Sequence, residues 1–77
     1  MKQITEEWLD RAREDLDVAL EIISREHLTN MVAFHSQQAV EKTLKGIIEE
    51  FEIGFAKIHN LERLLSMVKT RWFLTWI

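Results

Sequence analysis

The stretch FHSQQAVEKTLK, residues 34–45, decides the fold of this chain of 77 residues. On a helix, successive residues are about 100° apart, and the residues in and around this stretch then fall on two opposed faces. One face carries Ala33, Val40, Leu44, Ile47 and Phe51. The other carries His35, Ala39, Lys42, Thr43 and Gly46. Because a surface helix needs a single apolar stripe, the pattern predicts a central helix that is covered on both sides.

The second face carries small residues at helical spacing. Ala39 and Gly46 are seven residues apart with Thr43 beside them, an arrangement that lets another helix approach closely. Glycine inside a helix costs about 1 kcal/mol relative to alanine, so we expect a packing reason for Gly46. Either a third helix or the same helix of a second subunit is expected there. We therefore assign Ala39, Thr43 and Gly46 to self-association.

An antiparallel hairpin is predicted upstream of this stretch. A helix is expected over residues 6–24 with Thr5 as its N-cap, and its acidic residues are expected to face solvent. Its apolar face comprises Trp8, Leu9, Ala12, Leu16, Ala19, Leu20 and Ile23. Residues 25–30 break the pattern and offer Thr29 and Asn30 as caps for a second helix over residues 31–52. So short a connection favours antiparallel neighbours.

A loop and a third helix are predicted after the hairpin. Residues 53–59 form the loop, with Gly54 as helix terminator, and Asn60 caps the third helix. The apolar stripe of that helix comprises Leu61, Leu64, Leu65 and Val68. Residues 71–77, RWFLTWI, end the chain with large apolar groups, and we assign Trp72, Phe73 and Trp76 to self-association. These groups bury against the hairpin, bury in a dimer, or are the remnant of a longer domain.

Composition narrows the class of protein. A chain of 77 residues forms one domain at most, and domains this small are often stabilised by binding a partner. It lacks cysteine and proline, and 47% of its residues are hydrophobic, which favours an all-α domain in a reducing cytoplasm. There is no apolar run of membrane-spanning length and no signal peptide. The net charge of −3 argues against DNA as a partner.

Polar residues of the central stretch are the candidate ligand site. His35, Gln38, Lys42 and Lys45 would hold a phosphate or nucleotide through charge-assisted hydrogen bonds. The structural alternative is that His35 and Gln38 satisfy each other, or a neighbouring backbone group, at a buried helix contact while Lys42 extends to solvent. His59 and Asn60 are further candidates, with the alternative that they only cap and fix the loop. No metal site is expected, because two of the three histidines lie in loops and no HxxxH or HxxE pairing occurs on one helix. No cofactor is expected either.

The pairing of AFHSQQAVEKTLK, residues 33–45, with KIHNL, residues 57–61, resembles the HEPN domain family. The resemblance covers about residues 6–67 and implies an antiparallel helical bundle that commonly dimerises. Many prokaryotic members act beside a minimal nucleotidyltransferase as a toxin–antitoxin pair. Active members are metal-independent RNases with a motif of arginine followed after four to six residues by histidine. No arginine and histidine here have that spacing, so no catalytic residue is assigned.

The sequence therefore predicts one all-α domain over residues 1–77, an antiparallel hairpin plus a third helix in an up-and-down bundle. We expect the further C-terminal helices of the family to be missing. The expected function is a self-associating, nucleotide-binding interaction module that partners a minimal nucleotidyltransferase or RNA and forms a homodimer or higher oligomer. The alternatives are a metal-independent RNase toxin and a purely structural assembly protein.

Overall fold

Helices account for nearly all of the described chain. The computed structural model describes residues 1–53 and 60–76, with side chains up to residue 70. It contains α1 (Gln3–Ile22), the 3-10 helix η1 (Glu26–Leu28), α2 (Thr29–Phe51) and α3 (Leu61–Trp76). The all-α class, the helical hairpin and the third helix are confirmed. Within the described residues, no helix combines the length and the apolar character needed to cross a membrane.

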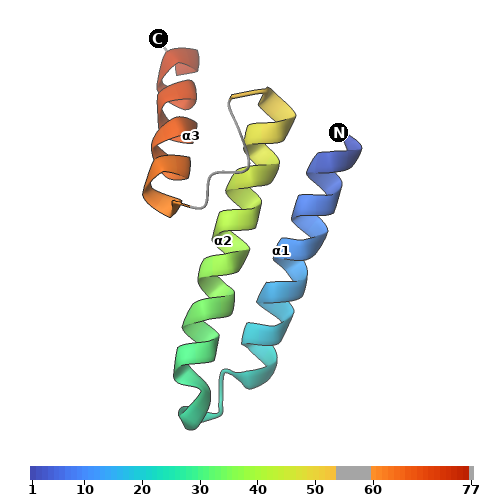
Figure 1. The fold of residues 1–77 in the computed structure, drawn as a ribbon, viewed down its shortest axis with the longest axis vertical. Helices are drawn as coiled ribbons and strands as arrows, with labels where there is room; N and C mark the ends of the chain where they lie inside the picture. The colour runs from blue at the N-terminus through green and yellow to red at the C-terminus, as the bar shows by residue number, and fades with distance from the viewer. Residues whose placement is uncertain (54–59, 77) are drawn as a thin grey trace.

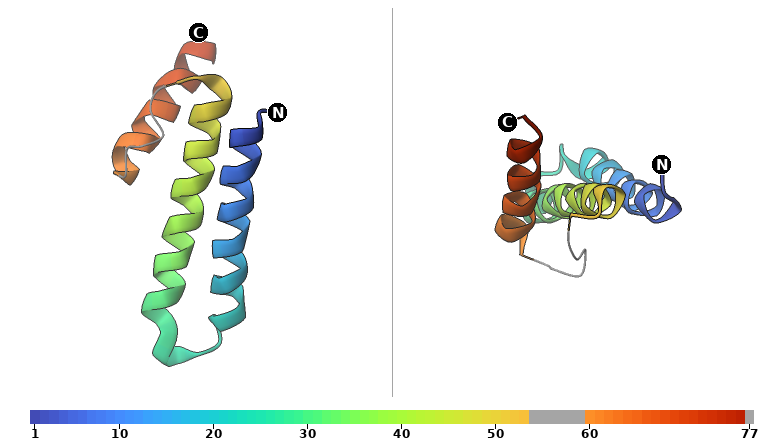
Figure 2. Two further views of the ribbon diagram at one scale, coloured as in Figure 1. Left: turned by 45° about the vertical axis from the view of Figure 1, so that its right-hand side comes forward. Right: turned by 90° about the horizontal axis from the view of Figure 1, so that it is seen from above.

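The three α-helices lie in a row with α2 in the middle. Figure 1 shows α1 and α2 side by side and antiparallel, with α3 on the opposite side of α2 from α1. The same order is seen from above in Figure 2. The up-and-down order holds for the α1–α2 hairpin, whereas α3 starts beside the middle of α2 and runs in the same direction as α2. Within the part of the chain that the structure describes, one edge of the hairpin is therefore left without a third helix.

The start of α1 differs from the prediction. The helix begins at Gln3, so Thr5 is an internal residue and the N-cap position is Lys2. Thr5 is 3% exposed and donates its hydroxyl to Glu50 Oε1 at 2.9 Å. The backbone N–H of Lys2 donates to the same oxygen at 2.9 Å, and Lys2 Nζ donates to the Glu49 carbonyl at 3.0 Å. The C-terminal turn of α2 thus replaces a local cap at this helix end.

The ends of α2 also differ in detail from the prediction. Thr29 opens the helix, and its hydroxyl donates to the Glu26 carbonyl at 2.8 Å, so neither Thr29 nor Asn30 is the N-cap. At the other end, Glu52 adopts the left-handed conformation with φ 52°, and its N–H bonds to the Ile48 carbonyl. A left-handed residue at this point closes the last turn and ends the helix. The predicted terminator, Gly54, lies outside the described residues.

The cap and core of α3 follow the prediction. Asn60 Oδ1 accepts a hydrogen bond from the Arg63 N–H at 3.0 Å, which confirms Asn60 as the cap. Leu64 of α3 is fully buried against Leu44 and Ile48 of α2. Leu61, Met67 and Val68 pack around this cluster, whereas Leu65 is 42% exposed. The apolar stripe of α3 is therefore narrow, as expected, and it faces α2.

The two faces of α2 exist, but the small-residue face meets α1 and not the predicted third helix or second subunit. A Cβ added to Gly46 would lie 3.4 Å from Trp8 Cβ and 3.5 Å from Leu9 Cδ2, so the small-residue face meets α1. On the predicted apolar face, Leu44 is buried, whereas Val40 is 51% and Phe51 is 54% exposed. Small residues on α2 accommodate large side chains of α1, and part of the apolar face is left open.

Candidate functional site

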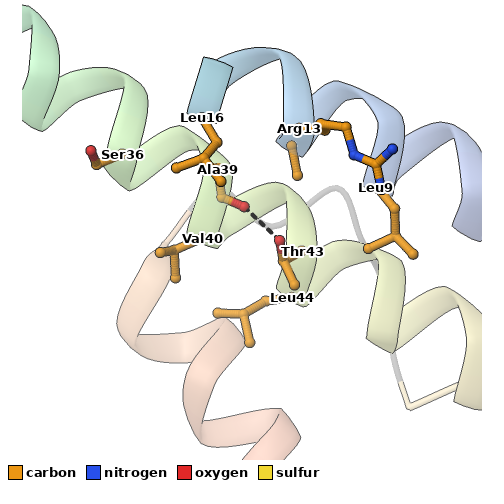
Figure 3. A pocket seen from close by; sticks show the side chains of 9 residues that line it. Leu9, Arg13, Leu16, Ser36, Ala39, Val40, Thr43 and Leu44 are labelled. Carbon is orange, nitrogen blue, oxygen red and sulfur yellow. Dashed lines mark hydrogen bonds between the residues drawn. The ribbon is translucent and has the colours of Figure 1, made fainter. Parts of the chain in front are cut away.

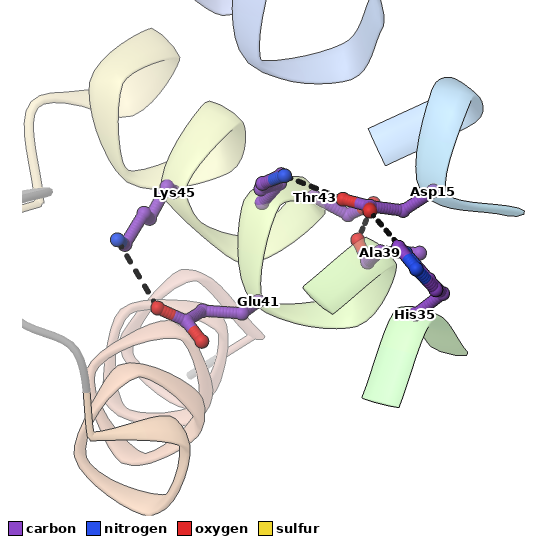
Figure 4. A network of polar contacts seen from close by, with 7 residues as sticks. Asp15, His35, Ala39, Glu41, Thr43 and Lys45 are labelled. Carbon is purple, nitrogen blue, oxygen red and sulfur yellow. Dashed lines mark hydrogen bonds and ion pairs between the residues drawn. The ribbon is translucent and has the colours of Figure 1, made fainter. Parts of the chain in front are cut away.

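A buried carboxylate joins the two helices of the hairpin. Asp15 of α1 is 8% exposed, and two side chains of α2 bind it. His35 Nδ1 lies 2.8 Å from Asp15 Oδ1, and Lys42 Nζ lies 2.5 Å from Asp15 Oδ2 (Figure 4). An ionised carboxylate only accepts hydrogen bonds, so the histidine donates from Nδ1. His35 and Lys42 are two turns apart on one face of α2, which is why a single carboxylate reaches both.

The carboxylate of Asp15 is paired with a cation in this cluster. Burial of the Asp15 carboxyl raises its pKa, but hydrogen bonds from Lys42 and His35, together with their charges, lower the pKa below its ordinary value overall. Asp15 therefore neutralises the positive charge of Lys42 inside the interface. His35 bonds to Asp15 and not to Gln38, the partner named in the structural alternative, and Gln38 is half-buried on α2.

Asp15 is the site residue that sequence reasoning missed. The expectation that the acidic residues of this helix face solvent is wrong for Asp15, although it holds for Asp10, Glu14 and Asp17. A signal for its burial is present in the sequence. Asp15 lies three residues after Ala12 and four before Ala19, both buried, so it falls inside the apolar stripe of α1.

The remaining predicted ligand residues lie elsewhere. Lys45 is buried on another side of α2, 3.1 Å from Glu41 Oε1 and with its Nζ 5.1 Å from the Trp8 ring centroid. Figure 4 shows this pair apart from the Asp15 cluster, with α2 between them. Asn60 caps α3, and His59 lies outside the described residues. The structure therefore unites His35 and Lys42 but separates Lys45 and Asn60 from them.

An apolar groove follows the open edge between α1 and α2 (Figure 3). It has a volume of about 570 Å³ and is lined by Leu9, Ala12, Arg13, Leu16, Ser36, Ala39, Val40, Thr43 and Leu44. Leu16 is 47% and Val40 is 51% exposed. The Thr43 hydroxyl donates to the Ala39 carbonyl at 2.8 Å, so its hydrogen bond is satisfied within α2. Among the described residues, Arg13 is the one charged side chain in the lining.

The residues assigned to self-association have three different outcomes. Ala39 and Thr43 line the groove and stay candidates. Gly46 packs against α1 within the same chain, so its assignment to a surface for a second subunit is wrong. Trp72, Phe73 and Trp76 lie in α3 by their backbone, but their side chains are outside the described residues.

Two carboxyl groups make stability depend on pH. The backbone N–H of Lys2 and the hydroxyl of Thr5 lower the pKa of Glu50, and Lys42 and His35 lower that of Asp15 against the effect of burial. Because the folded pKa values are depressed, the stabilisation is complete above the ordinary carboxyl values of about 4 and is lost as pH falls through the folded values. Urea unfolding between pH 7 and pH 3 should show this loss. Asp15→Asn should show a smaller loss, and an unchanged slope in that variant would contradict the assignment.

The architecture defines a class: a small all-helical domain in which a hairpin, joined by buried charges, carries a short third helix. A family model described as HEPN domain matches residues 5–73. The chain therefore belongs to the HEPN domain family. Comparisons with curated proteins and with solved structures gave no match.

Proposed function

We propose that this HEPN domain is a self-associating interaction module whose hairpins pair through the groove between α1 and α2. The groove is the observation that supports this function. Its walls are apolar, and Leu16 and Val40 are about half exposed along it. A twofold symmetric contact would bury both residues in each copy, and complete burial of such a side chain is worth about 1.5–3 kcal/mol. Self-association therefore covers the apolar surface that a small domain cannot bury alone.

A minimal nucleotidyltransferase is the second partner that we propose, within a toxin–antitoxin type system and in the cytoplasm. Membership of the family supports this partner, because many prokaryotic members act beside such an enzyme. The proposal gives this chain no catalytic role, because the arginine–histidine motif of the RNase members does not occur in it. Identifying the genes on either side of the coding sequence tests this partner. If one of them encodes a nucleotidyltransferase, co-purification of that enzyme with this protein is the second test. Neighbours without a nucleotidyltransferase, or separate elution of the pair, would remove this partner.

We expect Val40→Glu to weaken the homodimer at least tenfold. The side chain is half exposed in the groove, so the charge is tolerated in the monomer but is buried without a partner in the dimer. Sedimentation equilibrium of the full chain over a micromolar concentration series measures the dissociation constant. Gln37→Glu is the matched control, because it adds the same charge at an exposed position of α2 outside the groove. A monomeric wild type, or equal constants for the two variants, would contradict the proposed interface.

Nucleotide binding is the second function that we propose, because His35 and Lys42 converge on one carboxylate. A phosphate group would have to replace Asp15 as the acceptor for the Lys42 ammonium. Calorimetry with ATP, GTP and short RNA on the wild type and Lys42→Ala tests this binding. Heat with the wild type that is lost in the variant supports it. Absence of heat from all three ligands leaves the structural interaction module.

A further inference from the structure

Arg13 borders the apolar groove and forms no ion pair with any residue that the structure describes. Arg13 is exposed and lines the groove, and Asp17, one turn later on α1, is exposed as well. Among the residues that the structure describes, neither side chain forms an ion pair. Arginine four residues before an acidic residue is the weaker order for a pair within one helix. Both charges are therefore available to another molecule.

The charges lie along a row of leucines. At about 100° per residue, Leu9, Leu16 and Leu20 fall on one side of α1, and Arg13 and Asp17 fall beside them on the solvent edge. Leu16 is 47% and Leu20 is 58% exposed. Figure 3 shows Leu9, Arg13 and Leu16 together on the α1 side of the groove. This edge of α1 has an apolar row with one positive and one negative charge next to it.

We propose that the occupant of the groove is a second copy of this chain, with the two α1 helices antiparallel about a twofold axis near residue 15. This inference rests on the proposed self-association and adds its register. Arg13 and Asp17 are equally far from residue 15, so each Arg13 pairs with Asp17 of the second copy. Leu9, six residues before residue 15, and Leu20 of the second copy, five residues after it, then lie opposite each other to within one residue. Twofold symmetry repeats both contacts.

Charge complementarity and accessibility both favour this occupant. The groove is lined by apolar side chains and Arg13, and the same edge of α1 supplies apolar side chains and a carboxylate from the second copy. A patch that is complementary to itself is what a closed twofold contact requires. No described helix covers this edge, because α3 lies on the far side of α2 (Figure 2). Complementary charges at such a rim fix the register of an interface.

Charge reversal tests the register. We expect Arg13→Asp and Asp17→Arg each to raise the dissociation constant of the dimer at least tenfold, because each places like charges opposite one another twice. The double variant R13D/D17R should return to within about threefold of the wild type, since both pairs are restored with reversed sign. Mixing the two single variants should yield a heterodimer for the same reason. Sedimentation equilibrium at low salt measures all four samples.

Controls separate this inference from the proposed function. Glu14→Arg makes the same charge change as Asp17→Arg at an exposed position of α1 outside the groove, and should leave the dissociation constant unchanged. Circular dichroism should show equal helix content in all variants, because the substituted positions are exposed. The register is overturned if neither charge reversal changes the dissociation constant, or if the double variant has a dissociation constant as high as the single variants. Self-association stands in both cases. A monomeric wild type overturns both.

Discussion

Asp15→Asn should lower the free energy of unfolding by about 2–4 kcal/mol. This is less than the ~3–5 kcal/mol typical when a fully buried ion pair loses one partner, because Lys42 is partly exposed. The substitution keeps the size of the side chain but removes its charge. Lys42, whose side chain is 26% exposed, would keep its ammonium in the helix interface without a carboxylate. His35 would lose a charge-assisted hydrogen bond at the same carboxylate. A loss of this size is a large share of the 5–15 kcal/mol that holds a domain folded.

Urea unfolding followed by circular dichroism measures this loss, at one protein concentration because self-association adds to apparent stability. Asp10→Asn is the matched control on the exposed side of α1 and should change stability by less than about 0.5 kcal/mol. Lys42→Met combined with Asp15→Leu should recover part of the loss, because an apolar pair leaves no buried charge. Equal stabilities for Asp15→Asn and Asp10→Asn would show that the cluster does not hold the hairpin.

The sequence predicts the elements of this fold well, because each has a strong local signal. Hydrophobic residues at three- and four-residue steps predict all three helices, and Asn60 caps the third by a hydrogen bond within its first turn. The start of α1 is missed because its partner is distant in the sequence. Lys2 and Thr5 bind Glu50, and a hydrogen bond across 45 or more residues has no local signature.

The candidate site is predicted only in part, for a related reason. Periodicity divides α2 into two faces but does not say which helix covers each face. That choice depends on the fit of Gly46 to Trp8 and Leu9 of α1, which is a property of the assembled pair. The sequence identifies His35 and Lys42 as candidate ligand-binding residues, but the carboxylate that accepts their hydrogen bonds, Asp15, is on another helix. The groove likewise exists only after the hairpin has formed.

Gly46→Leu should be the most disruptive single substitution in the hairpin, with a loss of about 3 kcal/mol or more. A Cβ at this position would already lie 3.4 Å from Trp8 Cβ, 3.5 Å from Leu9 Cδ2 and 3.6 Å from the Thr5 carbonyl oxygen. A leucine adds three more carbon atoms where the space is filled by α1, so the two helices must separate. Separation would also lengthen the hydrogen bonds of Asp15 to α2, which couples this position to the charge cluster.

Gly46→Ala is the informative control, because its contacts are ordinary van der Waals distances and alanine favours the helix by about 1 kcal/mol. We expect this variant to be as stable as the wild type or up to about 1 kcal/mol more stable. It should also leave the dissociation constant of the homodimer unchanged, because Gly46 faces α1 of its own chain. A weaker dimer for Gly46→Ala, with stability intact, would instead place Gly46 at the contact between copies and remove the groove from that role.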